Sequence, residues 1–181
     1  HQTASCPEGK GAVLAITEAL AMASLDPCQV DYINAHGTGT RDNDLAEARA
    51  LKTLFGDRIP PFSSTKRIFG HALAASGALE AVVCLEALRR QQLPPNPGYS
   101  QMDPAIGLEP VAALRPASLT HVMSNSFGFG GNNAALIFSQ PEVAPHTLPL
   151  GPISVAVTGV GMTGPGKVTI REIEAPMPPD K

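Results

Sequence analysis

Residues 31–40 read DYINAHGTGT and residues 64–71 read STKRIFGH, and these two stretches decide the fold. Each lies on a short run of β-forming residues that ends in glycine and polar residues. A helix-forming segment separates the two stretches, and a long alanine-rich one follows them. This alternation of strands and helices predicts a layered α/β domain. It also places His36, Lys66 and His71 at strand ends and at the start of the long helix, where a catalytic cluster can form.

Local signals set the boundaries of the predicted elements. Helices are predicted over residues 11–25, 42–55 and 70–92, and strands over 29–35, 61–65, 121–126 and 134–139. Asp42 or Asn43 is expected to cap the second helix, and Gly56 to end it. One side of the third helix is expected to carry its small and apolar residues, namely Leu73, Gly77, Ala81, Cys84, Leu85 and Leu88.

Composition narrows the classes of function. The chain has 181 residues, of which 43% are hydrophobic, and its net charge of -3 argues against nucleic acid as a partner. No segment has the apolar length of a membrane span, and no basic and then apolar leader opens the chain. Because the chain starts at His1, we expect a fragment or a processed product. Cys6, Cys28 and Cys84 match no metal-binding spacing, which favours a reduced cytoplasmic protein without a metal site.

Each candidate residue also has an ordinary structural explanation. His36 could be a buried histidine that bonds to backbone groups, and Lys66 could be a solvated surface lysine. At the start of a helix, His71 would face the positive end of the helix dipole, which favours an uncharged ring. An uncharged imidazole can donate its N–H to a developing oxyanion. A lysine close to His71 would favour the uncharged ring as well.

Two carboxylates could belong to the same cluster. Asp44 and Glu47 lie three residues apart on the second predicted helix, so they share a face of that helix. They are either part of a solvated face or the charge partner that orients Lys66. The residues alone leave both interpretations open.

Four motifs, taken together, resemble those of a known family. They are NAHGTGT at 34–40, the D-x-x-E pair at 44–47, SSTKxxxGHxxxxSG at 63–77 and NSFGFGGNN at 125–133. In this order and at these spacings, they resemble the C-terminal half of the β-ketoacyl-acyl-carrier-protein synthases. The resemblance covers about residues 1–140, and HQTASCPEGKGA at 1–12 is similar to the entry into that half.

The resemblance implies a fold and a reaction. The fold is thiolase-like, an α-β-α-β-α layered sandwich made of two similar α/β halves and found in a homodimer. In the reaction, a cysteine takes an acyl chain as a thioester, malonyl carrier protein loses CO2, and the resulting carbanion attacks the acyl group. No cofactor is implied beyond the phosphopantetheine that arrives on the acyl carrier protein.

The resemblance also assigns roles to residues of this chain. His36 and His71 match the two family histidines that bind the malonyl thioester carbonyl and stabilise the enolate. Lys66 matches a family lysine that supports the site, together with the carboxylates corresponding to Asp44 and Glu47. The substrate-binding positions are two that contact the phosphopantetheine arm, Thr38 and Thr40, and three in the glycine-rich loop, Phe127, Gly128 and Phe129. Phe129 matches a gate between the acyl and malonyl pockets.

The chain departs from the family pattern in its nucleophile. None of its cysteines has the Cys-Ser or Cys-Ala setting of the family nucleophile, which lies in the N-terminal half. We therefore expect no acyl transfer by this chain alone and a cysteine-bearing N-terminal half or subunit as partner, besides the acyl carrier protein. Asn132 replaces the usual threonine and is expected to alter loop packing. The alternative function is that of a non-catalytic partner subunit, similar to a chain-length factor.

The segment after Gln140 is different in composition. Residues 141–152 predict a proline-rich linker, and residues 153–181 a tail with one strand-like run, at 153–158. The glycines of GVGMTGPGK at 159–167 match part of a dinucleotide fingerprint and of a phosphate-binding loop. Both patterns need a following helix, which Pro165 and the extended-type residues 168–176 argue against. The tail also resembles the opening strand of a synthase N-terminal half, so it is either the start of a second synthase-like region or a strand that completes a sheet in trans.

Overall fold

A computed structural model describes residues 6–141, 160–162 and 169–171 of the chain. Its helices in chain order are α1 (Lys10–Ala23), α2 (Arg41–Phe55), α3 (Lys66–Phe69) and α4 (Ser76–Arg90). Short 3-10 turns cover Pro27–Gln29, Leu73–Ala75 and Phe129–Gly131. The strands are β1 (Tyr32–Asn34), β2 (Phe62–Ser63), β3 (Gln92–Leu93), β4 (Arg115–Pro116), β5 (His121–Phe127), β6 (Asn133–Ser139), β7 (Val160–Met162) and β8 (Thr169–Arg171).

A mixed sheet with the strand order β2-β1-β5-β6 forms the centre of the larger unit. β1 runs parallel to both β2 and β5, while β6 runs antiparallel to β5. The carboxyl ends of β1, β2 and β5 therefore lie at one edge of the sheet. His36 follows β1 at that edge, Lys66 follows β2, and Phe127 ends β5. The register thus brings together residues that are far apart in the sequence.

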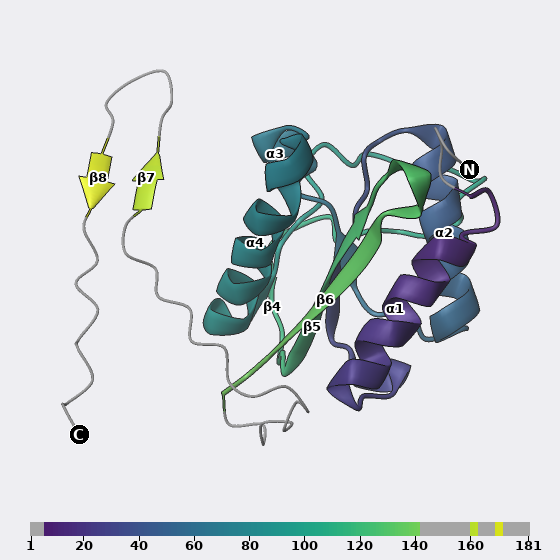
Figure 1. Cartoon of the computed structure of the whole chain (residues 1–181), viewed down its shortest axis with the longest axis horizontal. Helices are drawn as coiled ribbons and strands as arrows, with labels where there is room; N and C mark the ends of the chain where they lie inside the picture. The colour runs from purple at the N-terminus through teal and green to yellow at the C-terminus, as the bar shows by residue number, and fades with distance from the viewer. Residues whose placement is uncertain (1–5, 142–159, 163–168, 172–181) are drawn as a thin grey trace. The chain divides into compact units, whose positions relative to one another are not determined.

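Helices cover both faces of this sheet, as Figure 1 shows, with α1 and α2 on one side and α4 on the other. Neighbouring residues of a strand point to opposite faces. Tyr32 of β1 accordingly packs with Cys84 and Leu88 of α4, whereas Ile33 packs with Ile16 of α1 and Leu51 of α2 in the second cluster. The predicted α/β layering is confirmed.

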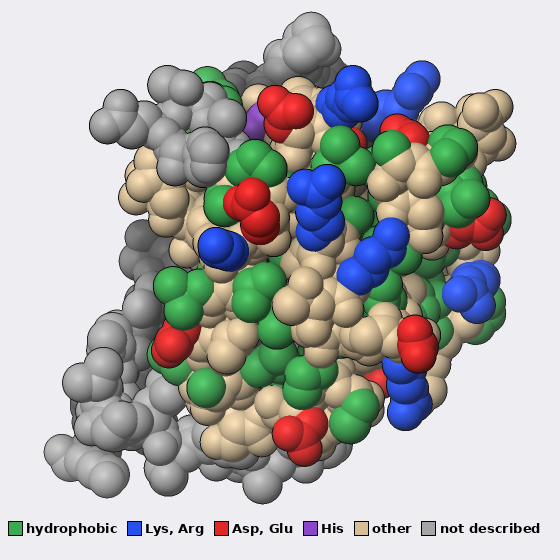
Figure 2. Space-filling model, turned by 90° about the vertical axis from the view of Figure 1, so that its right-hand side faces the viewer, with side chains coloured by type: hydrophobic (Ala, Val, Ile, Leu, Met, Phe, Trp, Pro, Cys, Tyr) green, Lys and Arg blue, Asp and Glu red, His purple; other side chains and the backbone are tan. Residues whose placement is uncertain are grey.

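The outer surfaces of the two helical layers differ. Over α1 and α2, basic and acidic side chains are dispersed among hydrophobic and other polar ones, as Figure 2 shows. On α4, the side chains of Leu79, Val82 and Leu85 are 38%, 58% and 50% exposed. The buried stripe of α4 consists of Ser76, Glu80, Cys84, Ala87 and Leu88. The apolar side that the sequence predicted for this helix is therefore wrong at Leu85. It is also wrong at Leu73, whose side chain is 79% exposed.

The long helix starts later than the sequence predicts. α4 begins at Ser76 rather than at Gly70, and the segment before it contains the short helix α3 and a turn. Gly70 and Leu73 have φ angles of 75° and 49°, which break an α-helix. The prediction that His71 opens the long helix is therefore wrong, because His71 lies in the turn before it.

The predicted cap of α2 is also wrong. The helix begins at Arg41, so the N-cap position falls on Thr40 and not on Asp42 or Asn43. Asp42 and Asp44 instead lie in the first turn, where their negative charges interact favourably with the positive end of the helix dipole. Gly56 ends the helix, as predicted.

The smaller unit contains a short antiparallel pair, in which Val160 of β7 lies opposite Arg171 of β8. The predicted strand at 153–158, most of the linker, and the glycine and lysine positions 159, 164, 166 and 167 lie outside the described residues. The division into domain, linker and tail stays a prediction. Within the residues that the structure does describe, none of the helices combines the length and the apolar character needed to cross a bilayer.

Candidate active site

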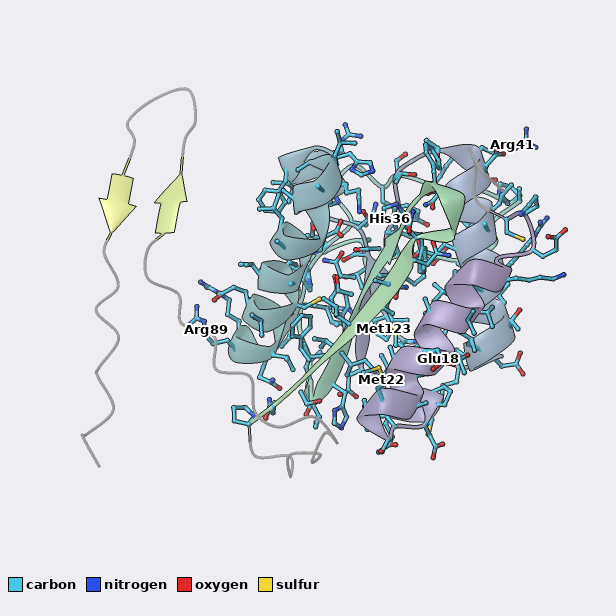
Figure 3. All side chains as sticks on the ribbon, in the orientation of Figure 1. Glu18, Met22, His36, Arg41, Arg89 and Met123 are labelled. Atoms are coloured by element: carbon cyan, nitrogen blue, oxygen red, sulfur yellow. The ribbon has the colours of Figure 1, made fainter. Side chains whose placement is uncertain are left out.

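The two histidines meet at the carboxyl edge of the sheet. The ring centroids of His36 and His71 are 5.7 Å apart, and the ring planes are nearly perpendicular at 86°. The ring of Phe127, at the end of β5, lies 5.9 Å from that of His36. Figure 3 shows His36 at the end of the sheet, between the two helical layers. The connections that follow β1, β2 and β5 thus converge on one place.

Glu47 of α2 holds the backbone around His36. Its carboxylate accepts the N–H of His36 at 3.0 Å, the N–H of Gly37 at 2.9 Å and the side-chain amide of Asn125 at 3.2 Å. Burial raises the pKa of Glu47, and these three donors oppose that rise. A Cβ at Gly37 would lie 2.6 Å from that of Ser64, and the φ angle there is 38°. The turn after His36 therefore needs a glycine.

The His36 ring is uncharged at neutral pH. The side chain is buried, and this burial, together with the nearby charge of Lys66, lowers the pKa of His36 to about 3. Its Nδ1 atom is buried and has no hydrogen-bond partner among the described residues. His36 is therefore a neutral imidazole whose Nδ1 is unpartnered within the part of the chain that the structure describes.

Acidification should destabilise the chain through His36. Its folded-state pKa of about 3 lies below the ordinary 6.5, so between these values only the unfolded chain binds the proton, and stability falls as the pH falls. From pH 7 to pH 5 we expect a loss of up to about 2 kcal/mol from this residue. Urea unfolding of the wild type and of His36→Gln at both pH values tests this. The pKa values of Asp44, Glu47 and Glu80 are raised in the folded state, so these carboxyl groups make the folded protein more stable as the pH falls. Both proteins contain these three groups, so the difference between the two proteins reports His36. Equal acid losses in the two proteins would contradict the prediction.

The proton of a neutral His71 lies on Nε2. Its Nδ1 accepts the backbone N–H of Leu73 at 3.2 Å, so the Nδ1 lone pair is used and the other nitrogen carries the hydrogen. Leu73 has a positive φ of 49°, a conformation that costs a non-glycine residue energy. The strained turn directs this N–H at the ring. Within the described part of the chain, the Nε2–H of His71 has no acceptor, so it can donate to a substrate group.

Lys66 pairs with Glu80 rather than with the two carboxylates that the sequence suggests. The Lys66 Nζ donates to Glu80 Oε1, and both side chains are buried. Burial raises the pKa of Glu80, while Lys66 opposes the rise. Asp44 bonds to the Gly39 N–H at 3.3 Å and to the Asn43 amide at 3.2 Å. Among the described residues, Lys66 is oriented by its bond to Glu80, whereas Asp44 and Glu47 bond to the backbone of the turn after β1. The charge of Lys66 still acts on Asp44, since it opposes the rise in the pKa of Asp44 that burial causes.

Sequence reasoning missed Glu80, although a signal for it exists. The residue lies four positions after Ser76 and four before Cys84, on the buried stripe of α4. A carboxylate on such a stripe needs a cationic partner, since an unpaired buried charge is costly. Asn34 below the site was also missed, and both polar atoms of its buried side chain have no partner among the described residues.

An open cavity of about 900 Å³ brings together most of the predicted substrate-facing residues. Its lining includes His36, Thr38, Thr40, His71, Phe127, Gly128 and Phe129. The hydroxyls of Thr38 and Thr40 lie 2.9 Å apart, and Phe129 is 69% exposed. Lys66, Asp44 and Glu47 border a second cavity of about 480 Å³, which shares Thr38 and His71 with the first. Two imidazoles beside an apolar wall can donate hydrogen bonds to a substrate oxygen on which negative charge develops.

The cysteines lie away from this cavity. Cys84 is buried in α4, its Sγ lies 3.7 Å from the carbonyl oxygen of Met123, and burial raises its pKa to about 12. Cys6 donates to the carboxylate of Glu8, and Cys28 is exposed. None of the three lines the cavity that contains both histidines. A thiolate that faces the histidines must come from outside the described residues.

Comparison with known proteins gives the same family by sequence and by structure. Residues 1–100 match the family described as "Beta-ketoacyl synthase, C-terminal domain". The "3-oxoacyl-[acyl-carrier-protein] synthase 2" of Mycobacterium tuberculosis is 41% identical over 141 residues, which are 77% of this chain and 34% of that protein. The mitochondrial "3-oxoacyl-[acyl-carrier-protein] synthase" of Arabidopsis thaliana is 42% identical over 146 residues, 77% of this chain and 32% of the relative.

Two solved structures are similar over the same part of the chain. "The ishigamide ketosynthase/chain length factor" aligns with a TM-score of 0.73 and 36% identity, and the match covers 77% of this chain and 34% of that one. A type II PKS ketosynthase, solved in complex with its acyl-carrier protein and bound to the hexaketide, has a TM-score of 0.71 and 31% identity, with coverage of 76% and 34%. The chain spans about a third of the length of the curated relatives it matches.

Proposed function

The chain belongs to the β-ketoacyl synthase family and has the thiolase-like fold of the C-terminal half, and from this premise we propose that it supplies the histidine pair of a decarboxylative condensing enzyme. The reaction is a Claisen condensation between malonyl carrier protein and an acyl thioester in fatty acid or polyketide synthesis. A cysteine-bearing N-terminal half provides the nucleophile.

The observation that carries the proposal is the pair of imidazoles, with ring centroids 5.7 Å apart in one cavity. When the malonyl group loses CO2, the electron pair of the breaking carbon–carbon bond moves toward the thioester carbonyl, and an enolate oxygen develops. This step needs hydrogen-bond donors and no base. His71 offers its Nε2–H, and the uncharged His36 stands beside it.

In the second step, the enolate carbon attacks the acyl thioester on the cysteine of the other half. The carbon–carbon bond forms, the thioester bond breaks, and the thiolate leaves. Throughout, Lys66 keeps a positive charge near the site and Glu80 balances it. Glu47 fixes the backbone that carries His36. Asp44 supports the following turn.

The remaining residues are assigned to substrate binding. Thr38 and Thr40 hydrogen-bond the phosphopantetheine arm, and Phe129, in the loop with Phe127 and Gly128, separates the acyl and malonyl pockets. Their common place on the lining of one cavity supports this assignment.

The partners follow from the same reaction. They are the acyl carrier protein, which brings the phosphopantetheine so that the enzyme needs no cofactor of its own, and the cysteine-bearing half, in a dimer of the complete synthase. One similar structure is a ketosynthase in complex with its acyl-carrier protein, which supports the first of these partners. We place the enzyme in the cytoplasm.

Reconstitution tests the proposal. The 181-residue chain is combined with a cysteine-bearing N-terminal half, and release of CO2 from malonyl carrier protein and formation of the ketoacyl product are measured. We expect both reactions in the complex and no acyl transfer by the chain alone. A stable complex that neither releases CO2 nor condenses would support the alternative, a non-catalytic partner subunit similar to a chain-length factor.

A further inference from the structure

Ser76 uses its hydroxyl in an unusual way for its position. It is the first residue of α4, and it is only 5% exposed. Serine near a helix start normally caps backbone N–H groups. Here Ala75 occupies the N-cap position without a side-chain cap, and the Oγ of Ser76 lies 3.1 Å from Nδ1 of His71. The hydroxyl therefore serves the histidine rather than the helix.

The direction of this hydrogen bond follows from its neighbour. The Leu73 N–H already donates to Nδ1, so this nitrogen is an acceptor, and the Ser76 hydroxyl is a second donor that shares its single lone pair. Two donors on Nδ1 favour the tautomer in which Nε2 carries the proton. Leu73 lies on a strained turn, whereas Ser76 belongs to a regular helix of 15 residues. Ser76 thus ties the ring to the rigid element.

We propose that Ser76 is a positioning residue for His71, which fixes the tautomer and the orientation of the ring. The role in the reaction rests on the function proposed above. The hydrogen bond itself does not, so the two ideas can be tested separately. Alanine at this position would leave Nδ1 with the single donor from the strained turn, and the ring would gain freedom.

Nitrogen-15 NMR of the histidines tests the hydrogen bond in the 181-residue chain. In the wild type, the His71 spectrum should show an Nδ1 acceptor and an Nε2–H. In Ser76→Ala the Nδ1 resonance should shift and the Nε2–H tautomer should lose population, while Ser76→Thr, which keeps a hydroxyl, should resemble the wild type. Ser139→Ala is the matched control, because the Ser139 Oγ lies 2.7 Å from Nδ1 of His121, at the other end of β5. This control should alter the His121 signals alone.

Decarboxylation in the reconstituted complex provides the second measurement. Ser76→Ala should lower kcat about three- to tenfold with KM unchanged, the effect of one lost hydrogen bond, and Ser76→Thr should restore most of it. Circular dichroism confirms that each variant folds. An unchanged His71 spectrum in folded Ser76→Ala would overturn the proposal. A changed spectrum, in a complex in which even the wild type fails to decarboxylate, would overturn the proposed function and leave the positioning role of Ser76 intact.

Discussion

Replacing His36 by alanine is expected to lower malonyl decarboxylation by the reconstituted enzyme about 10²- to 10³-fold, the usual effect of removing one donor to a developing oxyanion. The rate of CO2 release measures this loss. His71→Ala should have an effect of the same order, because both rings line one cavity. The two losses should not add in the double variant, since the residues act on the same oxygen.

His121→Gln provides the control for the histidine variants. His121 is a buried histidine that bonds to Ser139 and takes no part in the cavity. Its replacement should leave decarboxylation unchanged in protein that circular dichroism shows to be folded. Full activity of folded His36→Ala and His71→Ala would rule out the enzymatic proposal.

Replacing Glu80 by alanine is expected to destabilise the 181-residue chain by about 3–5 kcal/mol, since it leaves the Lys66 ammonium buried without its partner. Urea unfolding measures the change. Glu86→Ala is the matched control on the same helix, because Glu86 forms exposed pairs with Arg89 and Arg90. This control should cost less than about 1 kcal/mol.

A double variant separates the charge from the packing at this site. If the cost of Glu80→Ala comes from an unpaired ammonium, then Lys66→Met with Glu80→Met should recover most of the lost stability, because two apolar side chains replace two charges. It should not recover decarboxylation. A single Glu80→Ala variant as stable as Glu86→Ala would contradict the buried pair.

Much of the fold could be predicted from local sequence. β-forming runs predicted β1, β2, β5 and β6, and apolar periodicity predicted α1 and α2, because such elements depend on residues close together in the chain. The motifs around His36 and His71 predicted that these rings would meet. Their proximity follows from parallel pairing of β1 with its neighbours, which places the connections after β1, β2 and β5 at one edge.

The sequence predictions fail where the backbone conformation, or the partner of a charged side chain, depends on residues far away in the sequence. The alanine-rich pattern extends unbroken from Gly70, yet Leu73 takes a positive φ, and the helix starts only at Ser76. Lys66 of α3 pairs with Glu80 of α4, and their separation of 14 residues in the sequence gives no sign of this contact. Asp44 and Glu47 share a helix face, as predicted, but they bind backbone N–H groups rather than the lysine.

The Glu47 carboxylate accepts the backbone N–H groups of His36 and Gly37, and it forms no hydrogen bond with the imidazole of His36 in the described structure. A substitution of the side chain to which we assign the chemistry can therefore leave the backbone around it in place. After a gene duplication, one copy could lose its chemistry through a single codon change at position 36 while its backbone geometry persisted. Silent paralogues of such a domain should consequently arise easily, and an intact Glu47 cannot by itself distinguish an active copy from an inactive one.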